Sequence, residues 1–239
     1  MEQAAFVTGA NHGLGLALVS GLLTQGWRVF AGQYEADWSE LDALQGQFPD
    51  ALHLVSLDVA SMESVRAAAQ NVAASTDRLD MLISNAAVFT ETSYPTIRGA
   101  QDYAEMMRLY NVNALGALRM VEAFLPLLDT GALKRLCFVS SEAGSITRAY
   151  RPSWFSYCMS KAALNMATRI LFNDLRPQGY TFRLYHPGSV RSYMHGTKNL
   201  SADMEPEEAA VPALAYFLTS LDDEDRLVMR DWQGEEWPW

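Results

Sequence analysis

Hydrophobic residues along the chain fall into two alternating patterns. Seven short apolar runs, rich in β-branched and aromatic residues, are bounded by turn-forming residues and occupy positions 4–9, 27–32, 52–59, 79–86, 133–141, 180–188 and 226–231. Segments with a helical repeat separate these runs, the longest of them at 101–128 and 155–175. Strands of this kind, alternating with helices, predict a parallel sheet that is buried by helices on both faces.

The 239 residues are expected to form one α/β domain of the Rossmann type. Of these residues 49% are apolar, which is enough for one large core, and no internal repeat, low-complexity tract or linker divides the chain. We therefore expect a doubly wound, seven-stranded parallel sheet with helices on both faces. In such open sheets, ligands bind outside the carboxyl ends of the strands, near the point where the strand order reverses.

Composition narrows the class of partner. The formal net charge of -10 argues against a nucleic-acid surface, because phosphate binding depends on clustered Lys and Arg. A small-molecule partner fits better, and an anionic cofactor would be held by backbone N–H groups and a few local cations. The four His and two Cys show none of the short spacings of a metal site, so no metal is expected.

We expect a cytoplasmic protein. The first ten residues, MEQAAFVTGA, lack the basic and apolar regions of a secretory peptide, and no run reaches the ~20 consecutive apolar residues that a membrane span needs. Cys137 lies in an apolar run and Cys158 in a helical segment, which indicates a reduced protein without a disulfide framework.

A glycine-rich stretch, TGANHGLG at 8–15, connects the first predicted strand to a helical segment. Gly9 permits a tight turn, Gly13 lets the backbone approach a pyrophosphate, and Gly15 lets the helix pack closely on the strand. The helix N-terminus offers its N–H groups to an anion. A turn without a ligand is the alternative, but the strand before it and the helix after it favour a nucleotide site, and no GK[ST] sequence indicates a P-loop.

Tyr157 and Lys161 lie four residues apart in YCMSK, near the start of the helical segment at 155–175. At this spacing both side chains lie on one face of a helix and can reach the same point. A nearby ammonium stabilises phenolate and lowers the pKa of the tyrosine toward the range where it exchanges a proton near neutral pH. An ordinary solvated pair on the helix surface is the alternative.

Several motifs occur in an order that resembles the short-chain dehydrogenase/reductase family over nearly the whole chain: TGANHGLG, SNAA, NVNALG, SS, YCMSK and HPGSVRSYM. Within that family, SSEAGSI, HPGSVRSYM and the C-terminal DWQGEEWPW are most similar to the small reductases grouped with sniffer-type carbonyl reductases and the bacterial C-factor. The resemblance implies an NAD(P)-dependent oxidoreductase that interconverts a ketone or aldehyde and its alcohol. A cofactor-binding signalling or regulatory protein on the same fold is the alternative.

The resemblance assigns four catalytic residues. Tyr157 would be the general acid that protonates the carbonyl oxygen of the substrate, and Lys161 would hydrogen-bond the nicotinamide ribose and lower the pKa of the tyrosine. Ser141 would hydrogen-bond the carbonyl oxygen, and Asn113 would hold a water that links the lysine to solvent. Asn111 competes with Asn113, which is preferred because ALG follows it as in the family pattern.

The same resemblance implies cofactor contacts along the strand ends. Asp58 would meet the adenine amino group, with a strand-end turn residue as the alternative, and Val190 and Ser192 would meet the nicotinamide carboxamide. Asn85 and Ala86 would pass beside the adenosine ribose, although an alanine follows them where the family usually has glycine. The complete expected set is Thr8, Gly9, Asn11, His12, Gly13, Leu14, Gly15, Gln33, Tyr34, Asp58, Val59, Asn85, Ala86, Ala87, Tyr157, Lys161, Pro187, Gly188, Val190 and Ser192.

Cofactor preference depends on the turn after the second predicted strand. Gln33 stands where an acid that binds the ribose 2′-hydroxyl usually sits, and Tyr34 stands where an arginine for a 2′-phosphate often sits. His12 could add a hydrogen bond or partial charge toward the phosphate, and Glu35 would oppose it. Because no acid at position 33 excludes the phosphate, NADP(H) is favoured over NAD(H), with only modest discrimination.

Substrate recognition is expected from aromatic and apolar side chains in loops that border the cleft. The candidates are Phe89, Tyr94, Tyr150, Trp154, Tyr193, Met194 and His195, each with core packing as the alternative. Together they indicate an apolar or aromatic carbonyl compound. His195 is expected in a lid, because Tyr157 already fills the role of the acid.

Self-association is also predicted. The helices at 101–128 and 155–175 carry more apolar surface than one sheet face can cover. Members of the family pair through the equivalent helices, so the resemblance implies a homodimer or homotetramer with an isologous interface.

Overall fold

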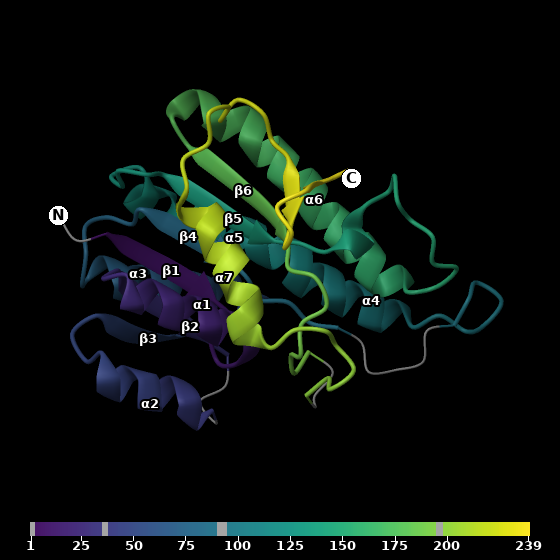
Figure 1. The fold of residues 1–239 in the computed structure, drawn as a ribbon, viewed down its shortest axis with the longest axis horizontal. Coiled ribbons are helices and arrows are strands. Elements are labelled where there is room, and N and C mark those ends of the chain that lie inside the picture. Colours follow the sequence, from purple (N-terminus) through teal and green to yellow (C-terminus); the bar gives the residue numbers. More distant parts are fainter. Residues whose placement is uncertain (1–2, 35–37, 90–94, 195–197) are drawn as a thin grey trace.

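Eight strands form one sheet in the computed structural model, which describes residues 3–34, 38–89, 95–194 and 198–239. They are β1 (Ala4–Thr8), β2 (Arg28–Gln33), β3 (Leu52–Ser56), β4 (Met81–Ser84), β5 (Arg135–Val139), β6 (Thr181–His186), β7 (Met229–Asp231) and β8 (Glu236–Trp237). Their order is β3-β2-β1-β4-β5-β6-β7-β8, in which the first seven strands of the chain pair in parallel (Figure 1). The doubly wound Rossmann fold and its seven predicted strands are therefore confirmed.

Helices cover both faces of this sheet (Figure 1). One face carries α1 (Gly13–Thr24), α2 (Ser39–Gln47) and α7 (Pro206–Leu218), and the other carries α3 (Met62–Ala73), α4 (Tyr103–Tyr110), α5 (Gly116–Leu128) and α6 (Phe155–Leu175). Side chains of each strand alternate between the two cores, so that in β1 Phe6 belongs to one cluster and Val7 to the other. None of the helices in the described ranges is both long and apolar enough to cross a bilayer.

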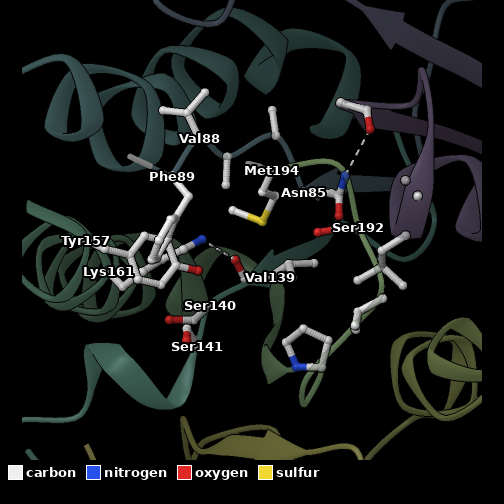
Figure 2. A pocket seen from close by; sticks show the side chains of 18 of the residues that line it. Asn85, Val88, Phe89, Val139, Ser140, Ser141, Tyr157, Lys161, Ser192 and Met194 are labelled. Carbon is white, nitrogen blue, oxygen red and sulfur yellow. Dashed lines mark hydrogen bonds between the residues drawn. The ribbon is translucent and has the colours of Figure 1, made fainter. Parts of the chain in front are cut away.

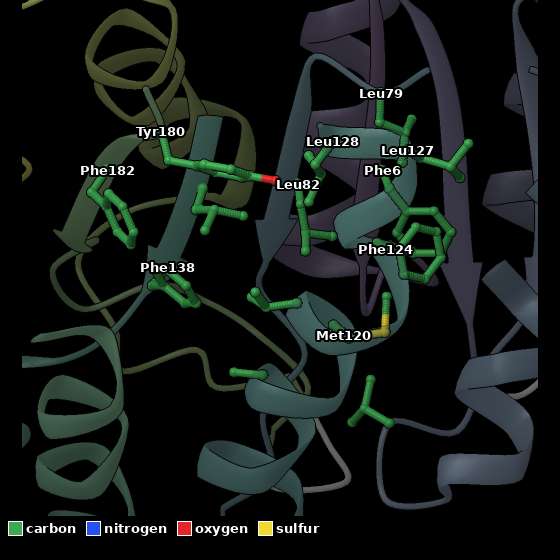
Figure 3. Close-up of a cluster of buried hydrophobic side chains, with 14 of the residues drawn as sticks. Phe6, Leu79, Leu82, Met120, Phe124, Leu127, Leu128, Phe138, Tyr180 and Phe182 are labelled. Carbon is green, nitrogen blue, oxygen red and sulfur yellow. The ribbon is translucent and has the colours of Figure 1, made fainter. Parts of the chain in front are cut away.

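Aromatic and aliphatic side chains fill the core on the α5 face (Figure 3). The rings of Phe6 in β1 and Phe124 in α5 have centroids 4.7 Å apart, and Leu127 and Leu128 continue the same helix face. Each fully buried side chain of this size contributes about 1.5–3 kcal/mol relative to its exposure. This packing fixes α5 on β1, and thereby fixes the carboxyl ends of the central strands.

The single helix that was predicted at 101–128 is divided in the structure. Asp102 caps α4 by accepting the N–H of Glu105 at 2.9 Å, and a π-helical turn, Asn111–Leu115, separates α4 from α5. At the start of α5, a Cβ added to Gly116 would lie 2.9 Å from Cγ2 of Val59. The π turn widens the helix locally without breaking its apolar repeat, so the sequence pattern could not reveal it.

The sequence analysis missed β8. This strand runs antiparallel to β7 after a turn at Gly234, whose φ is +85° and whose N–H donates to the carbonyl of Asp231 at 3.0 Å. The Asp231 carboxylate accepts two further N–H groups of the turn, those of Gln233 and Glu235, both at 2.9 Å. A strand of two residues shows no period of its own, so only its pairing with β7 defines it.

Candidate active site

A cavity of about 700 Å³ lies at the carboxyl ends of the strands, where the strand order reverses between β1 and β4. Tyr34, after β2, and Asp58, after β3, line one end of it, and Tyr157 and Lys161 of α6 line the other. The glycine loop at 8–15 and the segment after β6 lie between these ends. Figure 2 shows the end that contains Tyr157.

At Gly9 and Gly15, but not at Gly13, the glycine loop requires glycine for the reason that the sequence indicated. Gly9 has φ +63°, and an added Cβ would lie 2.8 Å from Cα of Ala86. A Cβ at Gly15 would overlap the carbonyl oxygen of Gly9, so the start of α1 packs directly on the turn. Gly13 has φ +58° and has room for a Cβ beside Ser192, so its positive φ is what requires glycine in this structure.

Thr8 and Asn85 lock the ends of β1 and β4 together. The Thr8 hydroxyl accepts the N–H groups of Asn85 and Ala86 at 3.0 and 2.9 Å, and the Asn85 side-chain amide donates to the carbonyls of Thr8 and Gly9 at 3.0 and 3.1 Å. The Asn85 amide nitrogen therefore supports the shape of the glycine loop. Thr8 lies behind the cavity wall that the described residues form, whereas Asn85, Ala86 and the neighbouring Ala87 line it.

The other end of the cavity is formed by the turns after β2 and β3. Asp58 and Val59 line it, and Asp58 also accepts the N–H of Ala60 at 2.8 Å, so its carboxylate shapes this turn. Tyr34 lines the cavity with 68% of its surface exposed. Gln33, by contrast, is the last residue of β2 and lies outside the described cavity wall.

His12 is the N-cap residue of α1, and its ring packs in an aromatic cluster. The centroid of the His12 ring lies 4.2 Å from that of Trp38 and 5.3 Å from that of Tyr193, which are themselves 4.9 Å apart. This cluster joins the glycine loop to the β2–α2 connection and to the segment after β6. The His12 side chain does not cap the helix, so the first turn of α1, with Gly13, borders the cavity through its backbone.

Tyr157, Lys161 and Ser141 converge at the end shown in Figure 2. Tyr157 and Lys161 project from the first two turns of α6 and are 9% and 2% exposed, and Ser141 follows β5. The Lys161 amine donates to the carbonyl of Val139 at 3.0 Å and lies 5.8 Å from the centroid of the Tyr157 ring. The Ser141 hydroxyl lies close enough to the Tyr157 phenol to lower the pKa of that phenol.

Burial dominates the protonation of this group. It raises the pKa of Tyr157 to about 12, although the nearby Ser141 hydroxyl acts in the opposite direction. Burial also lowers the pKa of Lys161 to about 8, because the cation loses its hydration. The expected lowering of the tyrosine pKa is therefore not found here: the lysine amine is held on Val139, and desolvation of the phenol outweighs the favourable interaction. Tyr157 consequently keeps its proton at neutral pH.

Asn113 lies in the π turn and is 2% exposed. Its amide nitrogen donates to the Val88 carbonyl at 3.0 Å and to the Ser160 hydroxyl at 2.9 Å, and its oxygen accepts the Val88 N–H at 2.8 Å. Asn111 instead accepts from Arg119 at 2.6 Å, on the side of the turn that faces Ala60. Asn113 thus connects α6 with the segment after β4 and lies behind the cavity wall, and its water contact remains a prediction.

The candidate substrate contacts divide into three groups. Phe89, Trp154 and Met194 line the cavity as expected, and the Phe89 ring lies 4.6 Å from the Tyr157 ring and 5.1 Å from the Trp154 ring. Tyr150 is 73% exposed and, like Tyr193, lies outside the cavity wall. The expected contacts at Tyr94 and His195, and the opposing charge at Glu35, fall outside the described residues.

Charged side chains that the sequence analysis missed also line the cavity: Arg108, Glu142, Arg151 and Asp203. Glu142 and Arg151 form a two-pronged ion pair, with Nη1 3.0 Å from Oε2, and the guanidinium stacks on the Trp154 ring at 4.5 Å. The position of Glu142 directly after Ser141 was the signal that could have revealed it. Arg151 is brought to the site only by its loop.

The segment after β6 closes the remaining side. Pro187, Gly188, Val190 and Ser192 line the cavity together with His186, as the resemblance implied for all but the histidine. Burial lowers the pKa of His186 to about 4, so the histidine faces the cavity as a neutral ring.

The residues present fit an extended dinucleotide. The cavity is continuous from Asp58 to Lys161. The first turn of α1, which follows the glycine loop, borders the middle of this cavity. Gly13, which has no side chain, and Ser192 lie side by side and both line the cavity, where an anion would meet backbone N–H groups. Tyr34 and Asp58 would then border the adenosine, and Lys161 and Val190 the nicotinamide end.

Known proteins are similar to this chain in sequence. The family model described as short chain dehydrogenase matches residues 3–203. C-signal of Myxococcus xanthus is 40% identical over 175 residues, which cover 73% of this chain and 100% of that protein. An uncharacterized oxidoreductase of Schizosaccharomyces pombe is 33% identical over 204 residues, covering 84% of this chain and 79% of that protein.

Solved structures extend the likeness to the whole chain. The NADPH-bound carbonyl reductase from chicken fatty liver has a TM-score of 0.87 and 30% identity, covering 100% of this chain and 99% of that one. The carbonyl reductase Sniffer of D. melanogaster has a TM-score of 0.90 over 100% of both chains, and at 23% identity it shows a shared fold. By the family match and the identity to its relatives, the chain belongs to the short-chain dehydrogenase/reductase family of oxidoreductases.

Proposed function

We propose that this enzyme interconverts a ketone or aldehyde and its alcohol, with Tyr157 as the general acid and base. The observation that carries the proposal is the convergence of the Tyr157 phenol, the Ser141 hydroxyl and the Lys161 amine at one end of a cavity whose middle is the glycine loop. A proton donor, a second hydrogen-bond donor and a cation stand together where the cofactor site ends. This arrangement suits charge that develops on a carbonyl oxygen.

In the reduction, a nicotinamide held at the Lys161 end of the cavity would supply the hydride for the carbonyl carbon. Ser141 and Tyr157 would hydrogen-bond the carbonyl oxygen, and the phenol proton would pass to that oxygen as it gains negative charge. A pKa of about 12 for Tyr157 keeps the phenol protonated until then. Lys161, whose pKa is about 8, carries a positive charge at neutral pH that would stabilise the phenolate left behind.

The wall beside Tyr157 supports an aromatic or apolar substrate. Phe89 and Trp154 meet edge to face, and Phe89 packs in the same way on Tyr157, so three rings form a continuous apolar surface. Trp154 has φ +69°, a left-handed conformation that costs an L-residue roughly 1–2 kcal/mol. Strain of this kind at a bulky side chain is typical of functional positions, which supports a role for Trp154 in holding the substrate.

We further propose that NADP(H) is preferred to NAD(H). No carboxylate at position 33 repels a 2′-phosphate, and Tyr34, at the next position, lines the cavity. The chicken carbonyl reductase was solved with NADPH and a Burkholderia multivorans relative, 27% identical, with NADP. The initial rates with NADPH and NADH and one substrate test this preference. A preference for NADH of more than about tenfold, or about 1.4 kcal/mol, contradicts it.

The experiment for the activity itself is a screen of carbonyl compounds, followed by the loss of reduced-nicotinamide absorbance. With the best substrate, Tyr157→Phe is expected to remove nearly all turnover and to leave cofactor binding largely intact, because the ring stays and only the proton donor is lost. Tyr150→Phe is the matched control, since this tyrosine lies outside the cavity wall. Turnover by Tyr157→Phe at the wild-type rate assigns the proton transfer to another group.

A second candidate is a signalling protein that binds the cofactor, which the 40% identity to C-signal favours. Such a protein would depend on the glycine loop for binding and would have no use for a proton donor at Tyr157. In a signalling assay with the purified protein, a Tyr157→Phe variant with full activity favours this candidate, and loss of activity in parallel with turnover favours the enzyme.

A further inference from the structure

The loop after β5 carries Ser141 and must be held at a fixed place relative to α6 for Ser141 and Tyr157 to act on one oxygen. The loop consists of Ser140, Ser141 and the short helical turn Glu142–Gly144. Within it, the Ser141 hydroxyl accepts the N–H of Ala143 at 3.2 Å. This local bond shapes the loop but does not attach it to α6.

Asn165 makes that attachment. It is 2% exposed and lies one turn after Lys161 and two turns after Tyr157, so the three side chains share one helix face. Its amide nitrogen donates to the Gly144 carbonyl at 3.0 Å, and its oxygen accepts the Ser140 hydroxyl at 2.6 Å. Because a carbonyl only accepts hydrogen bonds, the bond to Gly144 fixes the orientation of the amide.

The loop is pressed on the helix at the same point. A Cβ added to Gly144 would lie 2.9 Å from Asn165 Nδ2 and 2.9 Å from the carbonyl carbon of Lys161. The two bonds of Asn165 thus hold the residue immediately before Ser141 and the residue three positions after it. The Asn165 side chain thus bonds the loop on both sides of Ser141 to α6, the helix that carries Tyr157 and Lys161.

We propose that Asn165 is a positioning residue that holds the Ser141 loop in register with Tyr157 and Lys161. The proposal rests on the proposed function, because Ser141 and Tyr157 are its assumed targets. Asn165 itself does not line the cavity among the described residues, so its effect has to pass through Ser141. A displacement of about 1 Å in such a group can reduce turnover about a hundredfold.

The test compares Asn165→Leu with Thr168→Val. Both residues are buried in α6, but the Thr168 hydroxyl donates only to the Leu164 carbonyl of its own helix, at 2.9 Å. We expect Asn165→Leu to lower kcat at least tenfold while the dissociation constant of the reduced cofactor changes less than twofold. Thr168→Val should change neither by more than twofold. An unchanged kcat in Asn165→Leu, or an equal loss of cofactor binding, overturns the proposal.

A double-mutant cycle distinguishes positioning from general damage. If Asn165 acts through Ser141, the Asn165→Leu change should cost less than twofold in a Ser141→Ala background. Full multiplication of the two effects shows that Asn165 acts elsewhere. Ser140→Ala removes one of the two hydrogen bonds of Asn165 without changing α6. The loss of turnover that it causes should also vanish in the Ser141→Ala background. This variant keeps the test available if Asn165→Leu does not fold.

A measurement that needs no substrate separates this proposal from the proposed function. Amide hydrogen exchange in residues 141–146 should quicken at least tenfold in Asn165→Leu and stay unchanged in Thr168→Val. Unchanged exchange in both variants overturns the positioning role, whatever the activity. Faster exchange together with full turnover by Ser141→Ala and Tyr157→Phe retains the loop contact and refutes the chemistry assigned to those groups.

Discussion

Replacing Lys161 by methionine should abolish turnover and yet stabilise the folded protein at neutral pH. The Lys161 side chain is 2% exposed and its amine has one described hydrogen-bond partner, the Val139 carbonyl. Burial lowers the pKa of Lys161 from its ordinary value of 10.5 to about 8. A cation in this position is destabilising, and methionine has a similar length without a charge.

The size of the effect follows from the pKa. A change from 10.5 to about 8 corresponds to about 3 kcal/mol that the fold loses by holding the charged form, at 1.36 kcal/mol per pKa unit. Methionine leaves the Val139 carbonyl without its donor, which costs about 1–2 kcal/mol. Lys161→Met should therefore stabilise the protein by about 1–2 kcal/mol at pH 7, the difference between the two terms.

The dependence on pH gives a cleaner signature. Between the lowered pKa of about 8 and the ordinary value of 10.5, the unfolded chain holds the lysine proton and the folded chain does not. The free energy of unfolding of the wild type should thus gain a contribution that rises with pH across this window, and the variant should lack it. The advantage of Lys161→Met is present below pH 8 and disappears as the pH approaches 10.5.

Urea denaturation followed by tryptophan fluorescence at pH 7 and pH 9.5 measures both quantities. Lys198→Met is the matched control, because Lys198 is partly exposed and its ion pair with Glu205, at 2.9 Å, raises the pKa of the lysine instead of lowering it. A Lys161→Met variant that is less stable than the wild type at pH 7, with the same dependence on pH, refutes the reasoning and shows that the folded protein compensates the charge.

Two further outcomes are expected from the surroundings of the site. Trp154→Asn should lower kcat/KM at least tenfold for an aromatic ketone and less than threefold for a small aliphatic ketone. The unfolding free energy of this variant should stay within about 1 kcal/mol of the wild type, since asparagine tolerates the left-handed backbone better. Equal losses of kcat/KM for both substrates contradict a stacking role. Sedimentation should show a homodimer or larger assembly, because the apolar side chains of Met159, Met166 and Ile170 in α6 are 60%, 58% and 60% exposed. Met166→Glu should weaken the association. A wild-type monomer at micromolar concentration contradicts this prediction.

Patterns within one element were sufficient for most of the fold. Apolar runs marked all seven parallel strands, because strands buried on both faces must be apolar throughout. The helix at 155–175 was predicted with the bounds it has in the structure. The errors arose where an element has no period of its own, as in β8, or where one extra residue widens a helix, as at Asn111–Leu115.

The candidate site shows the same division. The side chains of Tyr157 and Lys161 share a helix face by their spacing alone, and Gly9 and Gly15 met the backbone constraints that a strand–turn–helix imposes. The expected direction of the Tyr157 pKa was wrong in this structure, because spacing says nothing about desolvation. Gln33 was expected at the cofactor, but whether the end of a strand faces a cavity depends on its neighbours.

The sequence by itself determined which residues can do chemistry and at which strand ends they lie, since both follow from a few neighbouring positions. Only the tertiary structure decided what each polar group is used for. Asn85 supports the glycine loop, Arg151 pairs with Glu142 and stacks on Trp154, and Asn165 bonds the Ser141 loop to α6. These contacts join segments that are far apart in the sequence, so no local sequence pattern predicts them. A hydrogen bond depends on the distance between its two groups and on their burial, and both are determined only when the helices have packed on the sheet.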